Sequence, residues 1–237
     1  MVQSVSADLI SVIADCEIGD LICSSLFTRS TRTRNSTKMG STSSLMLQEE
    51  EIQSIQKETG FSRNQIVRLY SRFLSLDKQG RGYLDRDDFL RIPELAINPL
   101  GDRIVDAFFS ETICDESGYR VSPDQRINFR EFIKVLAHFR PINKTKENIV
   151  NSRDEKLRFA FTMYDLNKNG YITRDEFKVI LNMMVGANIT AEQLDSIADR
   201  TITEADSDND GKISFQEFCK AMEKTDIEQK MSIRFLN

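Results

Sequence analysis

The sequence predicts an all-α protein made of two lobes, and two complete metal-binding loops are the main observation behind this prediction. Residues 165–176 read D-L-N-K-N-G-Y-I-T-R-D-E, and residues 206–217 read D-S-D-N-D-G-K-I-S-F-Q-E. Both carry oxygen-bearing side chains at positions 1, 3 and 5, glycine at 6 and glutamate at 12, which is the pattern of the EF-hand calcium loop. Apolar residues at helical spacing flank both loops, so each loop is expected to join two helices.

Calcium favours about seven oxygen ligands, and each loop can supply most of them. The predicted ligands are the side chains at positions 1, 3, 5 and 12 and the carbonyl at position 7, while position 9 (Thr173 or Ser214) often acts through a water. The predicted cofactor is Ca²⁺, with one ion in each loop. At position 8, Ile172 and Ile213 are expected to join the two loops in a short two-stranded ribbon. The ligand residues are Asp165, Asn167, Asn169, Tyr171 and Glu176 in the earlier loop, and Asp206, Asp208, Asp210, Lys212 and Glu217 in the later one.

A third loop, D-K-Q-G-R-G-Y-L-D-R-D-D at residues 77–88, keeps the shape of the motif but not its chemistry. Gly82 stands at position 6. However, Gln79 is a poor ligand at position 3, Arg81 places a cation at position 5, and Asp88 is short for bidentate contact at position 12. We expect this loop to bind calcium weakly or not at all.

The fourth element is visible mainly at its end, in R-I-N-F-R-E-F at residues 126–132. Ile127 falls at position 8 and Glu131 at position 12, whereas Arg120, Ser122, Asp124 and Gln125 stand where positions 1, 3, 5 and 6 belong. We expect this loop to be free of metal and expect Leu84 to pair with Ile127. The predicted fold is therefore a two-lobed EF-hand protein with four elements, of which the first two are degenerate.

Composition divides the chain into five segments. Residues 1–44 are expected to form a flexible leader or N-terminal extension. The polar stretch 141–155 is expected to link an N-lobe at 45–140 to a C-lobe at 156–229, with a tail at 230–237. The net charge of −5 does not imply a nucleic-acid partner. The four cysteines lack C-x-x-C spacing and are predicted to be reduced thiols of a cytosolic protein. No apolar run approaches the roughly 18 residues that a membrane-spanning helix needs.

The sequence does not predict an enzyme. The single histidine, His138, lies in L-A-H-F-R, where packing or surface exposure is a simpler interpretation than catalysis. There is no nucleophile elbow and no phosphate-binding glycine loop in the sequence. The alternative to catalysis is partner binding, because opened EF-hand lobes expose an apolar groove for an amphipathic helix.

Several segments outside the loops resemble one family, the calcineurin B homologous proteins. The resemblance runs from about Met39 to the C-terminus, and it includes linker and tail segments that metal chemistry does not dictate. Calcineurin B itself shares the R-I-P-E-L type segment but normally has four working loops. The stretch from Ser110 to Gln125 is longer than the second loop of that family, and residues 1–38 lie outside the resemblance. The matching segments are QKETGFS (56–62), LYSRF (69–73), RIPELAINPLGDRI (91–104), LAHFRPI (136–142), MMVGANI (183–189), SIADRTI (196–202) and EQKMSIRFL (228–236).

The resemblance implies a non-enzymatic calcium-binding regulatory subunit. Its expected partner is an amphipathic juxtamembrane helix of a plasma-membrane Na⁺/H⁺ exchanger, whose activity and pH response it would support. The alternative is a regulator of the phosphatase calcineurin, acting as an inhibitor or as a replacement regulatory subunit. A third possibility is a soluble calcium sensor or buffer without a fixed client.

The resemblance also bears on location. M-G-S-T-S-S at residues 39–44 fits the myristoylation pattern, so Gly40 is a predicted lipidation site if translation starts at Met39. The protein would then be cytoplasmic and peripheral at the plasma membrane, held by its partner as well as by the lipid. Residues 179–189 resemble a segment proposed for nuclear export in the family, although packing of the third element's exit helix is the favoured interpretation.

Overall fold

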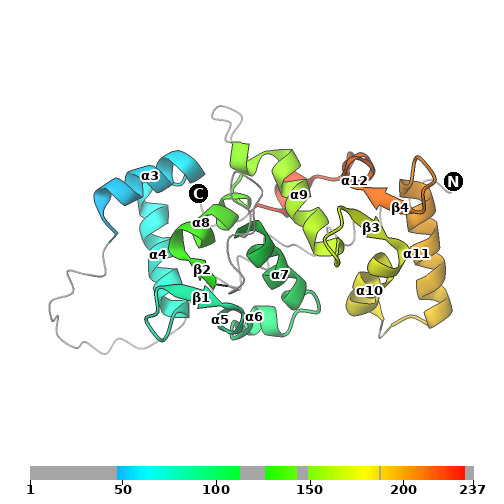
Figure 1. Cartoon of the computed structure of the whole chain (residues 1–237), viewed down its shortest axis with the longest axis horizontal. Coiled ribbons are helices and arrows are strands. Elements are labelled where there is room, and N and C mark those ends of the chain that lie inside the picture. Colours follow the sequence, from blue (N-terminus) through cyan, green and yellow to red (C-terminus); the bar gives the residue numbers. More distant parts are fainter. Residues whose placement is uncertain (1–46, 113–125, 143–148, 187, 233–237) are drawn as a thin grey trace.

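The computed structural model describes residues 47–112, 126–142, 149–186 and 188–232. It is built from short helices and two small ribbons, which confirms the predicted all-α EF-hand fold (Figure 1). None of the helices in these ranges is long and apolar enough to cross a membrane.

The elements follow the order expected for paired helix–loop–helix units. Those of the N-terminal half are α3 (Glu49–Thr59), α4 (Arg63–Leu76), β1 (Tyr83–Asp85), α5 (Arg86–Leu90), α6 (Pro93–Ala96), α7 (Gly101–Thr112), β2 (Arg126–Asn128) and α8 (Phe129–Ala137). Those of the C-terminal half are the 3-10 turn η1 (Ile149–Asn151), α9 (Arg153–Tyr164), β3 (Tyr171–Thr173), α10 (Arg174–Val185), α11 (Ala191–Ala205), β4 (Lys212–Ser214), α12 (Phe215–Ala221) and α13 (Ile227–Lys230).

Each exit helix begins with a capping box, in which two residues at the helix start satisfy each other's backbone N–H groups. The capping residue is the one at loop position 9, and its partner is the acid at position 12. This arrangement recurs in all four elements, because each loop ends where a helix begins. The pairs are Asp85 with Asp88, Asn128 with Glu131, Thr173 with Glu176, and Ser214 with Glu217.

Both predicted ribbons form. Leu84 lies opposite Ile127 where β1 pairs with β2, and Ile172 lies opposite Ile213 where β3 pairs with β4. Both ribbons are antiparallel, and all four of these central side chains are buried. The position-8 residues therefore tie the loops of each lobe together and anchor them in the core.

The two lobes share one hydrophobic core. Figure 1 shows the N-terminal half in cyan and green beside the C-terminal half in yellow and red, with α7 and α9 packed together at the junction. Phe108 on α7 and Phe139 after α8 contact Phe159 on α9 edge to face, with ring centroids 6.1 and 4.9 Å away. Helix α9 begins at Arg153, inside the stretch predicted as a linker, and its N-cap is Ser152.

The end of the described chain is tied to this junction. Helix α13 packs against α9, and Met231 is fully buried. Arg153 donates to the Met222 carbonyl at 2.8 Å, which holds the end of α12 against the start of α9. The first residues of the predicted tail are thus part of the core.

Candidate metal centres

In the loop at residues 165–176, backbone N–H groups donate hydrogen bonds to the acids at both ends. Asp165 at position 1 accepts bonds from the N–H groups of Asn169 and Gly170, at 3.1 and 2.8 Å. Glu176 at position 12 accepts from the N–H groups of Asn167 (3.0 Å) and Thr173 (2.9 Å), one on each carboxylate oxygen. The acids at both ends of the loop are therefore fixed in place by the loop's own backbone.

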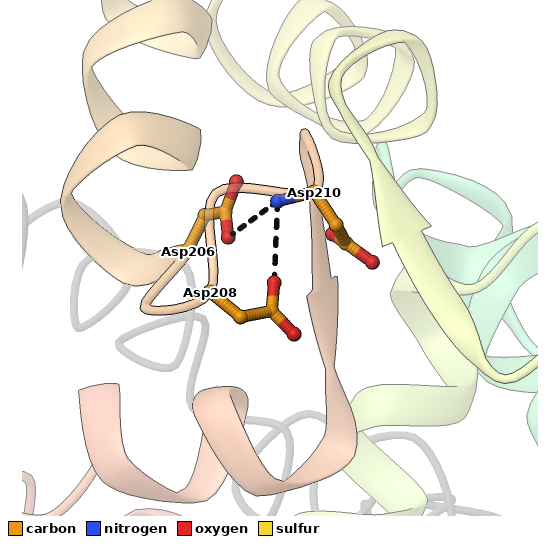
Figure 2. Close-up of side chains that lie close together, drawn as sticks. All are labelled: Asp206, Asp208 and Asp210. Atoms are coloured by element: carbon orange, nitrogen blue, oxygen red, sulfur yellow. Dashed lines mark hydrogen bonds between the residues drawn. The ribbon is translucent and has the colours of Figure 1, made fainter.

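The loop at residues 206–217 repeats this arrangement with more charge. Figure 2 shows Asp206, Asp208 and Asp210 gathered at the turn, with one carboxylate oxygen from each lying within 4.8 Å of the others. Asp206 accepts from the Asp210 and Gly211 N–H groups at 3.2 and 2.7 Å, and Glu217 accepts from the Ser207 N–H at 2.6 Å. The structure thus brings the three predicted aspartates together and holds the predicted glutamate against the same turn.

Both turns use the left-handed backbone region at the same two positions. Gly170 and Gly211 at position 6 have φ of 85° and 83°, and Lys168 and Asn209 at position 4 have φ of 59° and 60°. A side chain at position 6 would be strained at this φ, which explains the glycine of the motif. The matching pairs of angles show that the two loops share one backbone conformation.

The electrostatics of the later loop favour a cation. Local desolvation, together with the charges of Asp210 and Glu217, raises the pKa of Asp208. Burial alone would raise the pKa of Glu217, but hydrogen bonds donated by Ser214, Ser207 and Asp208 outweigh it and lower the pKa. The loop therefore holds ionised carboxylates close to one another, a repulsion that a divalent ion would relieve.

The donor set fits calcium. Carboxylate, amide and carbonyl oxygens are the ligands of this hard cation, and neither loop offers sulfur or imidazole. The carbonyls of Tyr171 and Lys212, at the first residues of β3 and β4, would complete the set with the acids and amides above. At position 9, the hydroxyls of Thr173 and Ser214 donate to Glu176 and Glu217, at 2.7 and 2.8 Å. A calcium ion bound here would offset two negative charges in each loop and be held by oxygens alone.

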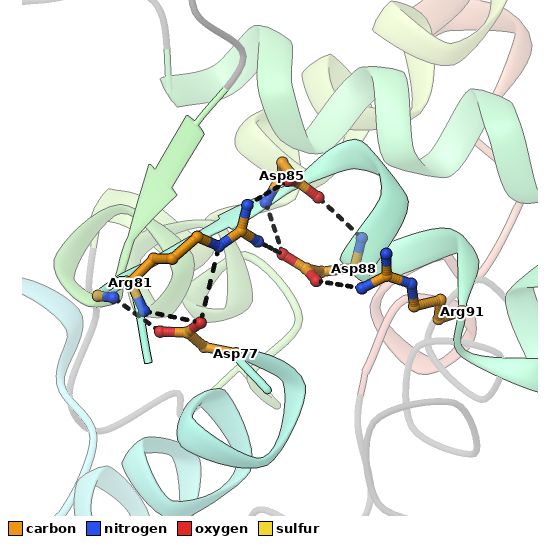
Figure 3. A network of polar contacts seen from close by, with 6 residues as sticks. Asp77, Arg81, Asp85, Asp88 and Arg91 are labelled. Carbon is orange, nitrogen blue, oxygen red and sulfur yellow. Dashed lines mark hydrogen bonds and ion pairs between the residues drawn. The ribbon is translucent and has the colours of Figure 1, made fainter. Parts of the chain in front are cut away.

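The first loop differs most in charge at position 5, where Arg81 points into the space between its acids (Figure 3). The guanidinium bonds to Asp85 at 2.6 Å and to Asp88, while Asp88 also accepts from Arg91 at 3.0 Å (Figure 3). The ligand pattern marked Arg81 only as damage to a metal site and gave no prediction of this contact. The arginine at ligand position 5, together with the acids at positions 9 and 12, was the signal that could have revealed it.

The second loop can be followed only at its end. The residues assigned to its positions 1, 3, 5 and 6 (Arg120, Ser122, Asp124 and Gln125) lie outside the described ranges, as does Gly40. Glu131 forms a capping box with Asn128, accepting from its N–H at 2.7 Å. Whether this element binds metal stays a prediction.

Replacing Glu217 by glutamine is expected to weaken calcium binding more than the same change at Glu176. The later loop has four formal charges, from Asp206, Asp208, Asp210 and Glu217, whereas the earlier one has two, so the later site is expected to fill first. We expect each variant to lose at least about tenfold in affinity at its own site, or about 1.4 kcal/mol. Calcium titration followed by calorimetry checks this, and an equal or smaller loss for Glu217→Gln would contradict the order of filling.

Comparison with known proteins agrees with this geometry. A family model described as an EF-hand domain pair matches residues 154–223, which span both complete loops. The chain is 44% identical to the calcineurin B subunit of Naegleria gruberi over 193 residues, covering 81% of this chain and 98% of the relative. It is 40% identical to the calcineurin B subunit of Kluyveromyces lactis (77% and 94% covered) and 37% identical to the type 2 calcineurin B subunit of Dictyostelium discoideum (80% and 94% covered).

These relatives match nearly their whole length, so the likeness extends beyond the calcium loops to both lobes. The match spans the two complete loops with their acids, the two ribbons and the hydrophobic core that the lobes share. The chain belongs to the calcineurin B-like family of calcium-binding EF-hand proteins.

Proposed function

We propose that the protein is a non-catalytic regulatory subunit that binds two calcium ions, at residues 165–176 and 206–217, and holds an amphipathic helix of a client protein. The observation that carries the proposal is the pair of complete, oxygen-only loops whose exit helices, α10 and α12, also supply the core. Because the chelating glutamates are the third residues of these helices, metal binding and helix position are coupled. In EF-hand proteins that open on binding calcium, the exit helices move and uncover apolar surface, and an amphipathic helix binds to that surface.

The first proposed client is the juxtamembrane helix of a plasma-membrane Na⁺/H⁺ exchanger. Its support is the resemblance of the linker, the tail and the 91–104 segment to calcineurin B homologous proteins, together with a first loop whose centre holds Arg81. A first loop whose centre is filled by the Arg81 guanidinium sets this chain apart from a calcineurin B with four calcium-binding loops. In this proposal the protein supports the exchanger's activity and pH response.

The second proposed client is the catalytic subunit of calcineurin. It is favoured by a specific observation, that the relatives compared above are themselves calcineurin B subunits by name. The protein would then inhibit the phosphatase by competing with its regulatory subunit, or replace that subunit.

Localisation follows from the client. We propose a cytoplasmic protein, peripheral at the plasma membrane, with Gly40 as a myristate site if translation starts at Met39. Nuclear shuttling through residues 179–189 is a separate proposal. In α10, Ile180 and Leu181 are buried, while Val179 and Met183 are each 42% exposed, so the part of the segment that lies on α10 is divided between core and surface.

Calorimetric titration against two helical peptides tests the function. One peptide is the juxtamembrane helix of a Na⁺/H⁺ exchanger, and the other is the helix of the calcineurin catalytic chain that receives its regulatory subunit. We expect the exchanger peptide to bind at least about tenfold more tightly, a difference of about 1.4 kcal/mol. The Glu176→Gln/Glu217→Gln double variant is the matched control for the contribution of calcium.

Each outcome separates the candidates. Preference for the phosphatase helix would replace the first client by the second. Binding of neither peptide, together with a large calcium-dependent opening of the free protein, would favour a sensor or buffer without a fixed client. By linkage, a helix that prefers the calcium-loaded form must raise calcium affinity by the same factor that calcium raises helix affinity.

A further inference from the structure

The first loop, residues 77–88, has the backbone conformation of the two complete loops. Gly80 and Gly82, at positions 4 and 6, have φ of 66° and 79°, close to the values at the same positions of the later loops. Asp77 at position 1 accepts from the N–H groups of Arg81 and Gly82 at 3.0 and 2.7 Å, as Asp165 does from Asn169 and Gly170. A loop whose ligand set is incomplete thus keeps the shape of a metal loop.

What distinguishes this loop is the cation at its centre. The Arg81 guanidinium contacts Asp85 and Asp88, the acids at positions 9 and 12, and its Nε lies 3.9 Å from Asp77 at position 1 (Figure 3). The side chains of Asp77 and Asp88 are each only 1% exposed. Buried carboxylates need a compensating charge, and here one side chain supplies it to acids from both ends of the loop.

The two complete loops have no such central cation among the residues that the structure describes. Within the same ranges, no lysine or arginine forms an ion pair with Asp165, Glu176 or Glu217, although all three are buried. In the first loop, the corresponding acids are Asp77 and Asp88, and both face Arg81. The guanidinium therefore lies between the acids at the two ends of the first loop, whereas Lys212 of the later loop pairs with Asp210 at position 5 (3.5 Å) and with neither end acid.

We propose that Arg81 takes the place of the calcium ion in the first loop and holds the N-lobe in the metal-loaded arrangement whether or not calcium is present. The guanidinium also lies over the ring of Tyr83, 4.7 Å from its centroid, which fixes its plane at the start of β1. Because the cation is covalently part of the loop, a chelator cannot remove it. Calcium then acts on the C-lobe alone, while the N-lobe half of the molecule is always formed.

Hydrogen exchange of the wild-type protein, with and without a calcium chelator, gives the first test. The Gly82 N–H, bonded to Asp77, is expected to keep its protection after chelation. The equivalent N–H groups of Gly170 and Gly211 are expected to lose protection, by up to about a hundredfold if calcium was present at about 100 times its Kd. Equal loss of protection at Gly82 would overturn the proposal.

Two variants give the second test, the first read by hydrogen exchange and the second by calcium stoichiometry from native mass spectrometry. Arg81→Gln leaves the three acids without their central cation, so the Gly82 N–H is expected to exchange faster in this variant than in the wild type. Arg81→Asp combined with Asp88→Glu restores acids at positions 5 and 12 and is expected to bind one more calcium ion than the wild type.

Arg91→Gln is the matched control, because Arg91 contacts the same Asp88 from the exposed side of the loop. It is expected to change neither the stoichiometry nor the protection of Gly82. If Arg81→Gln behaves like Arg91→Gln, or if the wild type already binds metal at residues 77–88, the arginine is not the substitute cation. If the double variant does not fold, the wild-type exchange experiment together with Arg81→Gln still decides the matter.

Discussion

Replacing Phe159 by alanine is expected to lower the free energy of unfolding by about 3–5 kcal/mol, the usual cost of deleting a buried aromatic ring. Phe159 lies on α9 in the C-terminal half and has no exposed surface. Its ring packs against Phe139 and Phe108 from the N-terminal half, with edge-to-face geometry at interplanar angles of 82° and 88°. The cavity would therefore open at the junction of the two lobes, not within one of them.

The position of the cavity predicts how the variant unfolds. Hydrogen exchange should show faster opening in both α7 and α9, because the lost contacts connect these helices. Urea unfolding followed by circular dichroism gives the change in free energy. Phe215→Ala is the matched control, since Phe215 is partly exposed and contacts Phe161 within the C-terminal half. Loosening confined to α9 in Phe159→Ala would show that the lobes are energetically independent.

Local sequence patterns were sufficient to predict the positions of the two complete loops and the pairing of the ribbons. Ligand spacing is a covalent property of twelve residues, so Asp165 to Glu176 and Asp206 to Glu217 could be placed without any tertiary information. The pairing of Leu84 with Ile127 and of Ile172 with Ile213 followed from the same count, because position 8 is fixed by position 6. The end of α3 at Gly60 is also a local feature of the structure, because a φ of 69° suits glycine.

The contacts between the lobes could not be predicted in this way. Phe108, Phe139 and Phe159 each have the pattern of ordinary core residues of their own lobe, and nothing in their spacing indicates that they meet. Composition also placed the boundary of the C-lobe between residues 155 and 156, a point that falls within α9. Such features are decided by long-range packing, which overrides local preference. Residue spacing within one segment does not show which distant segment it will contact.

Lys156 is the clearest case of a residue whose role depends on such packing. It is fully buried, and its ammonium donates to three carbonyls, those of His138 (2.6 Å), Arg140 (2.9 Å) and Met231 (3.0 Å). These carbonyls come from the end of the N-terminal half and from the C-terminal segment, while Lys156 itself is on α9. One side chain thus connects the two lobes and the tail.

Burial lowers the pKa of Lys156 from 10.5 to about 7, with Glu228 opposing the shift and Arg140 adding to it. Between these two values the unfolded chain binds a proton that the folded protein has lost, so stability is expected to rise with pH. The slope from this group is at most about 1.4 kcal/mol per pH unit, and the full cost of burying the charge remains below pH 7. His138 contributes in a separate, lower window, because burial and the charge of Lys156 lower its pKa from 6.5 to about 4.

Urea unfolding of the wild type and of Lys156→Met across about pH 7 to 10 checks this, and the variant is expected to lose the part of the slope due to Lys156. Lys57→Met is the control, since Lys57 is exposed on α3 and should leave the slope unchanged. A neutral amine has two N–H donors for three carbonyls, so the longest contact, to Met231, is expected to break first. The methyl resonance of Met231 should then shift through the same pH range in the wild type. A slope that Lys156→Met reproduces in full would mean that another group titrates, and that the tail is not held by this charge.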